Sequence, residues 1–542
     1  MPEETCDLTA QHVWGVQAAE KDRRKRTRAR VPALTILYHP DVRRIGEQAR
    51  LDDLLGGRAA HLSRNEPELA PPGQTGGQPL GDHHISRTPL RLLPSEGGVR
   101  LNAGESRTRV QADGVWVEDS RDFTAEEVRR GVVLELSDRV VLLLHTLPLD
   151  PFRAPSIPGL IGESEALLRV RNEIRRVADL EVPVLIRGET GTGKELVARA
   201  IHQASRRRDR TYLSVNMGAI PPSLATSELF GSVKGAFTGS VRDQAGYFQR
   251  AHDGTLFLDE IGEASAEVQV MLLRVLETGE IQRVGSPDAQ KVDVRLLAAT
   301  DADLEKAIQE GRFRGPLLHR LAGYEVSLPP LRERRDDFGR LLFFFLRQEL
   351  QAIGEERRLE APQGTEPTWI PPSIVARLAR HPWPGNVRQL RNAARQLVID
   401  SRSFDTVQVG PQVERLLREA SHPVNEAAAV SEPAPAAGAA PRRRAEPAGY
   451  RSPAEVSEEE LLEALRAHRW EVKAAAEHLG IARPSLYLLM EKFPGLRKAA
   501  DLSRTEILES RAACGGNLDA MVSQLEVSKK GLLQRMKQLG IG

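Results

Sequence analysis

The octapeptide GETGTGKE (Gly188–Glu195) constrains the fold more than any other stretch of this chain. It follows the apolar run VPVLIRG (Val182–Gly188), which is typical of a buried strand, and a predicted helix begins at Lys194. Glycines let several backbone N–H groups converge on phosphate oxygens, and the N-terminus of a helix adds a positive dipole. This strand–loop–helix context predicts a phosphate-binding loop in a parallel α/β domain, whereas a glycine-rich turn without function would not need it.

Lys194 is the residue of this loop that we expect to neutralise the β- and γ-phosphates of a nucleotide. Glu195 stands where a Ser or Thr hydroxyl commonly ligates Mg²⁺, which leaves Thr192 or a water molecule as alternative ligands. The predicted nucleotide-binding residues in this loop are Gly188, Glu189, Thr190, Gly191, Thr192, Gly193, Lys194 and Glu195.

A second apolar strand, in GTLFLDEIGE (Gly254–Glu263), ends in two carboxylates. We expect Asp259 to hold the hydration shell of Mg²⁺ through water and Glu260 to polarise the attacking water. An acidic strand end is weak support by itself. Together with the lysine loop it predicts nucleotide hydrolysis.

Arginines supply the remaining candidates for phosphoryl-transfer chemistry. Arg314 and Arg320 lie six residues apart in GRFRGPLLHRL, so one could serve its own subunit while the other reaches a neighbour. Ordinary surface ion pairs are the alternative role for both. Arg388, at the start of a predicted helix in WPGNVRQL, is placed to sense the γ-phosphate.

Composition and patterning divide the 542 residues into several domains. The short runs TILYHP, RLLP, VWVED, VVLEL and VVLLLHTL, separated by turn residues, predict a small all-β sandwich. The predicted divisions are a basic tail (1–30), the β-sandwich (31–147), a proline-rich linker (148–157), an α/β subdomain (158–330), a helical lid (331–404), an Ala/Pro-rich linker (405–454) and a helical C-terminal region (455–542).

The formal net charge of +1 argues against a globally basic nucleic-acid binder but leaves room for a local basic surface. The two cysteines, Cys6 and Cys514, lie near opposite ends and give no disulfide or metal-ligand spacing. The apolar runs are too short to cross a bilayer, and the N-terminus has no apolar signal region. We expect a cytoplasmic protein without a membrane partner.

The C-terminal region contains two similar halves. LGIARPSLYLLMEKF (Leu479–Phe493) aligns with LEVSKKGLLQRMKQL (Leu525–Leu539) at an offset of 46 residues. The apolar positions that match are Leu479/Leu525, Ile481/Val527, Leu486/Leu532 and Met490/Met536, which indicates a duplication.

Seven motifs in order carry a family resemblance: GETGTGKE, SELFG, GAFTGS, GTLFLDEIG, FRGPLLHRL, LPPLRER and WPGNVRQL. Over about 158–404 the chain resembles the AAA+ domain of sigma-54-dependent transcription activators. The resemblance implies an ATPase that uses ATP and Mg²⁺ and assembles as a homo-oligomer, with a hexameric ring expected. Glu195 after the lysine is itself typical of that family.

The resemblance gives the glycine-flanked loop GAFTGS a role: it implies contact with sigma-54 in RNA polymerase. A hairpin tip with Phe237 tucked onto the fold is the alternative reading. Glu228 matches a residue that couples nucleotide state to loop position, and Thr300 and Asp301 occupy the sensor position, where Asn or His is usual after the threonine. The implied contact residues are Gly235, Ala236, Phe237, Thr238, Gly239 and Ser240, of which Ser240 replaces the usual Ala.

The C-terminal halves resemble Fis-type helix-turn-helix units, with a helix at Val472–Leu479 that breaks at Gly480. A second helix entering the major groove of upstream promoter DNA would carry the base-reading side chains, and either half could provide it. A helical dimerisation module is the alternative. The candidate DNA-binding residues are Arg483, Ser485 and Tyr487 in the first half and Ser528, Lys529, Lys530 and Arg535 in the second.

The N-terminal β region resembles a forkhead-associated (FHA) domain through VRRIGEQARL and ISRTPLRL. The resemblance implies that Arg43 or Arg44, with Ser86 and Arg87, grips a phosphothreonine protein by charge-assisted hydrogen bonds. Thr88 stands near the usual His. A degenerate β-sandwich that only packs on the ATPase is the alternative.

Taken together, these patterns predict a sigma-54-dependent transcriptional regulator that binds upstream DNA and remodels the polymerase with ATP. Two other classes stay open: a AAA+ remodeller of another partner, and a DNA-binding regulator without productive ATPase.

Overall fold

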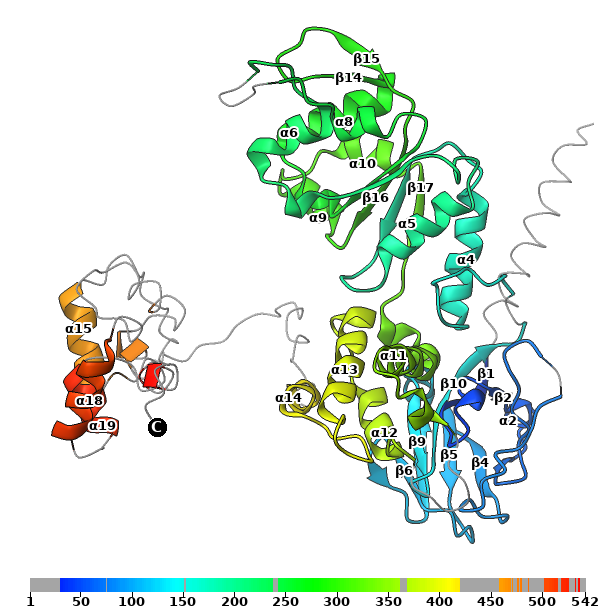
Figure 1. The fold of residues 1–542 in the computed structure, drawn as a ribbon. Helices are drawn as coiled ribbons and strands as arrows, with labels where there is room; N and C mark the ends of the chain where they lie inside the picture. The colour runs from blue at the N-terminus through cyan, green and yellow to red at the C-terminus, as the bar shows by residue number, and fades with distance from the viewer. Residues whose placement is uncertain are drawn as a thin grey trace, which may run out of the picture. The chain divides into compact units, whose positions relative to one another are not determined.

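The computed structural model describes residues 30–419, except 75, 151–152, 237–241 and 361–367, and parts of the C-terminal region. Those parts are 458–468, 470, 475–476, 478–479, 486, 502–514, 518–525, 532 and 535–536. The chain forms two compact units, Met1–Glu426 and Ala427–Gly542 (Figure 1). The predicted basic tail, except Arg30, and most of the predicted Ala/Pro-rich linker lie outside the described residues, and Arg30 begins the first strand.

The N-terminal region consists of two antiparallel sheets around one apolar core. A helix between β8 and β9, α3 (Ala125–Arg130), is capped by Thr124 and Glu127 in a reciprocal capping box. We call residues 30–148 the β domain. Its six-stranded sheet runs β2 (Gln48–Arg50), β1 (Arg30–Tyr38), β10 (Val140–Pro148), β9 (Val132–Leu136), β6 (Val110–Ala112) and β7 (Val115–Trp116), and its four-stranded sheet runs β3 (Ala60–Leu62), β4 (Leu90–Ser95), β5 (Gly98–Asn102) and β8 (Ser120–Thr124).

Strands β1, β9 and β10 are buried on both faces, which is unusual for an antiparallel sheet at a domain surface. Alternate residues such as Leu134 and Leu142 belong to the core of the β domain. Their neighbours Val133 and Leu143 belong to a different core, which is built mainly from the helical lid. The continuous apolar run VVLLLHTL therefore encodes two interfaces, one on each side of the sheet.

The α/β subdomain is a five-stranded parallel sheet flanked by helices, as the sequence predicts. Helices α4 (Glu165–Val177) and α8 (Ala266–Thr278) are the longest of the helices described in this subdomain. The strand order is β12 (Tyr212–Asn216), β13 (Thr255–Asp259), β16 (Arg295–Thr300), β11 (Val184–Arg187) and β17 (Tyr324–Ser327), and the other helices are α5 (Lys194–Gln203), α6 (Pro222–Phe230), α7 (Tyr247–Arg250), α9 (Leu304–Gln309) and α10 (Gly315–Leu321).

The lid follows two short 3₁₀ helices, η4 (Leu331–Glu333) and η5 (Arg335–Asp337), and extends past the predicted end at Phe404. Its last helix, α14, buries Val413 and Leu417 in the lid core, so the predicted linker beginning at 405 is wrong. The amphipathic segment VERLLRE directly precedes the Ala/Pro-rich stretch, and for that reason the sequence places it in the linker. The lid helices are α11 (Phe338–Ala352), α12 (Pro372–Arg380), α13 (Asn386–Asp400) and α14 (Pro411–Glu419).

The β domain packs on the lid through α11 and α12, which lie against β1, β9 and β10 (Figure 1). Arg335 donates to the carbonyls of Arg130 and Gly131 in the β domain and of Ala379 in the lid. Gly339 lies so close to β1 that a Cβ there would stand 2.4 Å from the carbonyl oxygen of Leu37. Apolar burial, hydrogen bonds and a close backbone approach therefore all join the β domain to the lid.

The C-terminal unit is helical, with α15 (Glu458–Ala467), α18 (Arg504–Ala513) and α19 (Leu518–Leu525) around its own apolar core. Only part of the predicted helix at Val472–Leu479 falls within the described residues, and 475–476 and 478 are helical there. No helix among the described residues of either unit is long and apolar enough to span a membrane.

Candidate nucleotide-binding site

The predicted phosphate-binding loop connects β11 to α5 at the carboxyl end of the parallel sheet. Gly191 and Gly193 adopt φ values of 79° and 107°, which lie in the region that favours glycine. The ammonium of Lys194 donates to the loop carbonyls of Gly188 at 2.7 Å and Glu189 at 3.4 Å. Burial lowers the pKa of Lys194, and the carboxylates of Asp301 and Asp259 oppose that shift. A cation held by two carbonyls of a glycine loop can exchange them for phosphate oxygens.

The lid covers this loop at its first turn. Arg388, in the first turn of α13, donates its backbone N–H to the carbonyl of Gly191 at 3.2 Å. A Cβ on Gly191 would lie 2.4 Å from the carbonyl oxygen of Gly385, so the loop tolerates only glycine there. The guanidinium of Arg388 is exposed beside the loop. This position supports the predicted sensing of a nucleotide, because lid and phosphate loop meet there.

Two lid residues to which the sequence assigned no role hold Glu189 of the loop. Arg332 pairs with both carboxylate oxygens of Glu189, at 2.8 and 2.5 Å, and Asn386 donates to the same carboxylate at 3.1 Å. The Arg332 guanidinium lowers the pKa of Glu189. Both residues belong to motifs that the sequence displays, LPPLRER and WPGNVRQL, but their contacts depend on how the lid folds back over the loop.

The two predicted catalytic carboxylates lie at the end of β13, on the same sheet edge as the loop. Asp259 accepts from the backbone N–H of Glu260 at 3.0 Å. Burial raises the pKa of Asp259, and the nearby ammonium of Lys194 lowers it. Glu260 adopts a left-handed conformation with φ 55°, an arrangement that costs free energy in a non-glycine residue.

Asn216 is a further residue at this edge that the sequence analysis missed. It ends β12 and is the register partner of Asp259 on the adjacent strand. A Cβ on the neighbouring Gly218 would lie 2.5 Å from a carboxylate oxygen of Glu260 and 3.3 Å from the side-chain oxygen of Asn216. A polar residue ending the apolar strand YLSVN is the signal that could have identified it.

The donors at this edge fit a magnesium–nucleotide complex. Asp259 supplies one carboxylate, and the hydroxyl of Thr192 lies in the loop, donating to the carbonyl of Glu189 at 2.7 Å. Magnesium in nucleotide sites takes one or two protein ligands and completes its shell with water and phosphate. No group of three His, Cys, Asp or Glu residues that could hold a metal alone occurs in the part of the chain that the structure describes.

The sensor-position residues Thr300 and Asp301 close the same edge from β16. Thr300 is buried and accepts from the backbone N–H of Ala302 at 3.0 Å. Asp301 accepts a hydrogen bond from Thr190 of the phosphate loop. The unusual aspartate at this position thus contacts the loop through a hydroxyl, which needs no donor on its own side chain.

Arg314 and Arg320 occupy the N-cap and the last turn of α10, and both side chains are exposed. Arg320 lies 3.6 Å from a carboxylate oxygen of Glu277, a contact between exposed groups. An action on a neighbouring subunit therefore stays a prediction, as does any action on their own site.

Comparisons with known proteins decide the nature of this domain. Residues 160–327 match the family model of the sigma-54 interaction domain, 332–423 match the AAA+ ATPase lid domain, and 452–493 match the bacterial regulatory protein Fis family. Residues 160–327 form a sigma-54 interaction domain. It belongs to the AAA+ ATPase class, and the lid match agrees with the position of α14.

Similar proteins include the anaerobic nitric oxide reductase transcription regulators of Aeromonas hydrophila and Klebsiella pneumoniae. The first is 41% identical over 340 residues, which cover 62% of this chain and 64% of that protein. The second is 41% identical over 328 residues, which cover 58% and 62%. This chain therefore spans less than two thirds of the length of these relatives. A crystal structure of NtrX from Brucella abortus in complex with ATP matches with 31% identity and a TM-score of 0.41, covering 62% of this chain and 69% of that one.

The GAFTGS loop of the sigma-54 interaction domain has a firmly held stem. Ser232 and Gln244 exchange backbone hydrogen bonds across it, and the side chain of Gln244 donates to Glu228 at 3.1 Å. A Cβ on Gly285, in the hairpin of β14 (Glu280–Gln282) and β15 (Ala289–Lys291), would lie 2.7 Å from the Cβ of Ala236. Glu228 therefore contacts the base of the loop, and its coupling of nucleotide state to loop position stays a prediction. Phe237, Thr238, Gly239 and Ser240 lie outside the described residues.

The predicted phosphothreonine grip by Arg44 is wrong for a physical reason. Arg44 is only 8% exposed, and acceptors within the β domain use all of its N–H groups. They are Glu47 and the carbonyls of Gln78, Pro79 and Leu80, at 2.7–2.9 Å.

The other phosphothreonine candidates are nearer the surface. Arg87 is exposed, and Ser86 is half-buried and accepts from the backbone N–H of Thr88 at 3.0 Å. Arg43 is exposed and pairs with Asp41 at 2.8 Å. The likeness to FHA domains itself stays a prediction.

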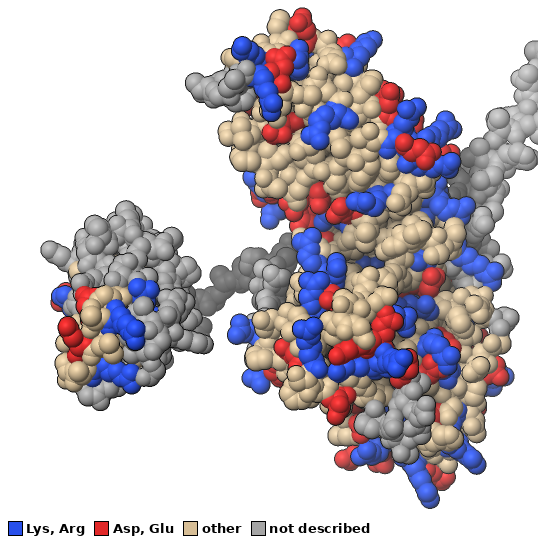
Figure 2. Space-filling view, in the orientation of Figure 1, with Lys and Arg blue, Asp and Glu red and all other residues tan. Residues whose placement is uncertain are grey.

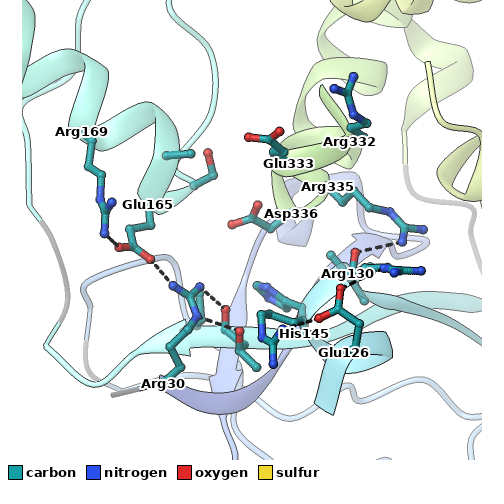
Figure 3. A pocket seen from close by; sticks show the side chains of 16 residues that line it. Arg30, Glu126, Arg130, His145, Glu165, Arg169, Arg332, Glu333, Arg335 and Asp336 are labelled. Carbon is teal, nitrogen blue, oxygen red and sulfur yellow. Dashed lines mark hydrogen bonds and ion pairs between the residues drawn. The ribbon is translucent and has the colours of Figure 1, made fainter. Parts of the chain in front are cut away.

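A charged pocket of about 400 Å³ lies where the β domain, α4 and the start of the lid meet (Figure 3). Arg30 links Thr146 of β10 to Glu165 of α4, so an ion pair crosses from the β domain to the sigma-54 interaction domain. Asp336 points into the same space from the lid side. Its neighbour Asp337 accepts hydrogen bonds from the backbone N–H groups of Glu163 and Ser164 and from the Ser164 hydroxyl. These donors favour the negative charge on Asp337. Burial and that charge raise the pKa of Asp336.

On the face of the first unit shown in Figure 2, basic and acidic residues are interspersed. This visible face offers no one-sign surface for nucleic acid. Of the predicted DNA-binding residues, Arg535 is described, and its Nε donates to the carbonyl of Leu502 at 3.1 Å, so part of its role is structural. The others, Arg483, Ser485, Tyr487, Ser528, Lys529 and Lys530, lie outside the described residues.

Proposed function

We propose that this chain is a sigma-54-dependent transcription regulator that hydrolyses ATP to remodel RNA polymerase at promoters. The observation that carries the proposal is the sheet edge of the sigma-54 interaction domain. There Lys194, Asp259 and Asp301 gather beneath a lid that contacts the phosphate loop through Arg388.

ATP chemistry at this edge assigns one task to each side chain. The ammonium of Lys194 exchanges its two loop carbonyls for β- and γ-phosphate oxygens. Asp259 would hold, through water, the magnesium ion that accompanies ATP, and that ion would supply positive charge against the developing phosphate charge. Glu260, which shares the turn after β13, polarises the attacking water. Arg314 or Arg320 from a neighbouring copy completes the site in a ring, for which a hexamer is the expected form.

Hydrolysis reaches the polymerase through Glu228. This residue joins α6 to Gln244 at the base of the GAFTGS loop, so a change at the nearby sheet edge can tilt the loop stem. Phe237 and Thr238 at the tip then press against sigma-54. Glycine flanks give this tip the backbone freedom that such a movement needs.

The β domain controls the enzyme through the lid. Its outer strand face shares a core with α11 and α12, so any change in the β domain acts on the element that covers the nucleotide. Phosphothreonine recognition, the finer part of this proposal, depends on Arg87, Ser86 and Arg43, because Arg44 has no N–H left to donate. A phosphothreonine peptide library should bind the wild-type chain, and R87A should lose that binding.

Open-complex formation tests the function. Purified chain, polymerase core and promoter DNA are combined with or without sigma-54, and with ATP or a non-hydrolysable analogue. We expect open complexes only with sigma-54 and ATP together. Open complexes without sigma-54 would favour a remodeller of another partner, and open complexes with the analogue would favour a regulator without productive ATPase.

A further inference from the structure

Asn386 joins three segments of the chain at the phosphate loop. Its side-chain amide donates to the carboxylate of Glu189 and to the carbonyl of Thr190, each at 3.1 Å. Its side-chain oxygen accepts from the backbone N–H of Leu331, at the start of the lid, at 2.8 Å. The residue is fully buried, and its backbone is left-handed with φ 52°, a conformation that Asn tolerates better than most residues. Asn386 therefore ties the loop to both lid segments that contact it.

The next two loop residues are also held by the lid. The carbonyl of Gly191 accepts from the backbone N–H of Arg388 at 3.2 Å. The carbonyl of Thr192 accepts from the guanidinium of Arg334, a side chain that is buried, at 3.3 Å. Each of residues 189–192 therefore has a hydrogen-bond partner in the lid. We call these partners the lid clamp: the side chains of Arg332, Arg334 and Asn386 and the backbone N–H of Arg388.

The lid clamp binds carbonyl groups of the loop and leaves its N–H groups available. Among the described residues, no hydrogen-bond acceptor is present for the backbone N–H groups of Thr190, Gly191, Gly193 and Lys194. These N–H groups are the donors with which a glycine-rich loop binds phosphate oxygens.

Peptide geometry connects the two sets of groups. In a planar trans peptide the C=O and the N–H point in opposite directions. The carbonyl of Thr190 shares its peptide with the N–H of Gly191, and the carbonyl of Thr192 shares its peptide with the N–H of Gly193. Because the lid holds both carbonyls, it also fixes the direction of both N–H groups, away from the lid contacts.

We propose that Arg332, Arg334 and Asn386 are positioning residues that hold the phosphate loop in its nucleotide-binding shape before a nucleotide arrives. Donors that are already in place need no reorganisation when the ligand binds. Arg332 has a second effect, because its guanidinium offsets the negative charge of Glu189, which would otherwise repel the phosphates. This inference rests on the proposed binding of ATP phosphates at this loop.

The positioning role differs from the γ-phosphate sensing predicted for Arg388 in the nucleotides that it affects. The loop N–H groups serve phosphates that ADP and ATP share, so loss of the lid clamp weakens both nucleotides alike. Loss of a γ-phosphate contact weakens ATP and leaves ADP unchanged. The ratio of the two affinities therefore separates the two roles.

Nucleotide affinity and steady-state kinetics of the full chain test the inference. R332A removes the ion pair with Glu189. N386D keeps the acceptor for Leu331 and a residue that tolerates the left-handed backbone, but it loses both donated hydrogen bonds. R395A is the matched control, because it breaks an Arg–Glu pair with Glu349 inside the lid. We expect R332A and N386D to raise the Kd of ADP and of ATP, and the KM for ATP, by about tenfold with kcat within about threefold, and R395A to change none of them.

A double-mutant cycle shows whether Arg332 acts through Glu189. E189Q removes the charge of the carboxylate and keeps the shape of the side chain. In this background R332A should raise the Kd of ADP by less than about threefold, because the charge that it offsets is already gone. A full tenfold effect in the E189Q background would overturn the positioning role of Arg332, since the guanidinium would then act on the nucleotide itself.

Three further outcomes would overturn the inference. They are unchanged affinity for both nucleotides in R332A and N386D, a loss confined to ATP, and a lower kcat at an unchanged KM. The last would mean that fewer molecules are folded while the folded ones bind normally. Failure of the proposed function looks different, because the wild-type chain and R395A would then bind neither ATP nor ADP.

Discussion

Lys194 in the phosphate loop and Arg44 in the β domain make a direct comparison, because each is a basic residue with only 8% of its surface exposed. The ammonium of Lys194 has two acceptors, both backbone carbonyls of a glycine loop, with carboxylates nearby that favour its charge. The guanidinium of Arg44 donates hydrogen bonds to the carboxylate of Glu47 and to three backbone carbonyls, and these acceptors use all its N–H groups. Burial of a cation therefore does not mark a ligand site. A ligand site needs a cation whose partners can be exchanged.

Removing Lys194 should have the largest effect. We expect K194A to lower ATP turnover by about 10³-fold or more, because it deletes the cation that neutralises the transferring phosphates. K306A, on the exposed face of α9, is the control and should keep wild-type turnover. Steady-state ATPase rates measure both. Wild-type turnover by K194A would remove the basis of the comparison.

Removing Arg44 should cost stability and leave the chemistry alone. R44A leaves the carboxylate of Glu47 and three carbonyls without their partner, and we expect the free energy of unfolding to fall by about 3–5 kcal/mol. R43A breaks only an exposed pair with Asp41 and should lower the free energy of unfolding far less than R44A does. Urea unfolding measures the two. A stable R44A that has lost phosphothreonine binding would show that Arg44 is a ligand residue after all.

Truncating Leu143 tests whether the β domain is part of the ATPase. Leu143 is buried in the core that β10 shares with the lid, so L143A should destabilise the first unit by about 2–4 kcal/mol. Because the core is shared, the loss of strand signal and the loss of ATPase activity on heating should shift together. L142A, which faces the core of the β domain instead, is the comparison variant. If L143A leaves the temperature of ATPase inactivation unchanged, the two domains unfold independently.

Asp336 in the junction pocket should give a pH-dependent effect. Its pKa is raised in the folded state, so the folded chain binds more protons than the unfolded chain above the ordinary Asp range. Stability therefore falls as pH rises through the raised pKa, and a shift of one unit is worth about 1.4 kcal/mol. D336N should remove this loss, stabilising the chain at pH 8 more than at pH 5. An equal effect of D336N at both values would show that the carboxyl titrates normally.

Local motifs made most of the nucleotide site predictable from the sequence. GETGTGKE and TLFLDE each place their residues within one strand and one turn, so the sheet edge follows from the parallel α/β pattern. Arg332 and Asn386 were not assigned, because their contacts with Glu189 arise only when the lid folds over the loop. Residues within one motif are predictable because their spacing along the chain fixes their positions. Residues that meet only through long-range packing are not.

Long-range packing also limits what the sequence predicts about the β domain. The apolar runs of β9 and β10 predict strands, and their two apolar faces indicate in addition that a second element covers the sheet. The sequence alone does not identify that element as the lid. The resemblance to FHA domains through VRRIGEQARL implied a ligand role for Arg44, whereas its contacts with residues 78–80 come from a loop more than thirty residues away. Helix α14 was not predicted, because its short amphipathic segment directly precedes an Ala/Pro-rich stretch and was counted as part of the linker.

The central claim is that ATP hydrolysis moves the GAFTGS loop against sigma-54, and T238A tests it most directly. The measurement is the number of open complexes formed per ATP hydrolysed, for T238A and for the wild-type chain with sigma-54 polymerase. We predict that T238A hydrolyses ATP within about twofold of wild type, because Lys194 and Asp259 are untouched, while its yield of open complexes falls to the level seen without ATP. An unchanged yield per ATP would contradict the account, since the work of hydrolysis would then reach the polymerase by another route.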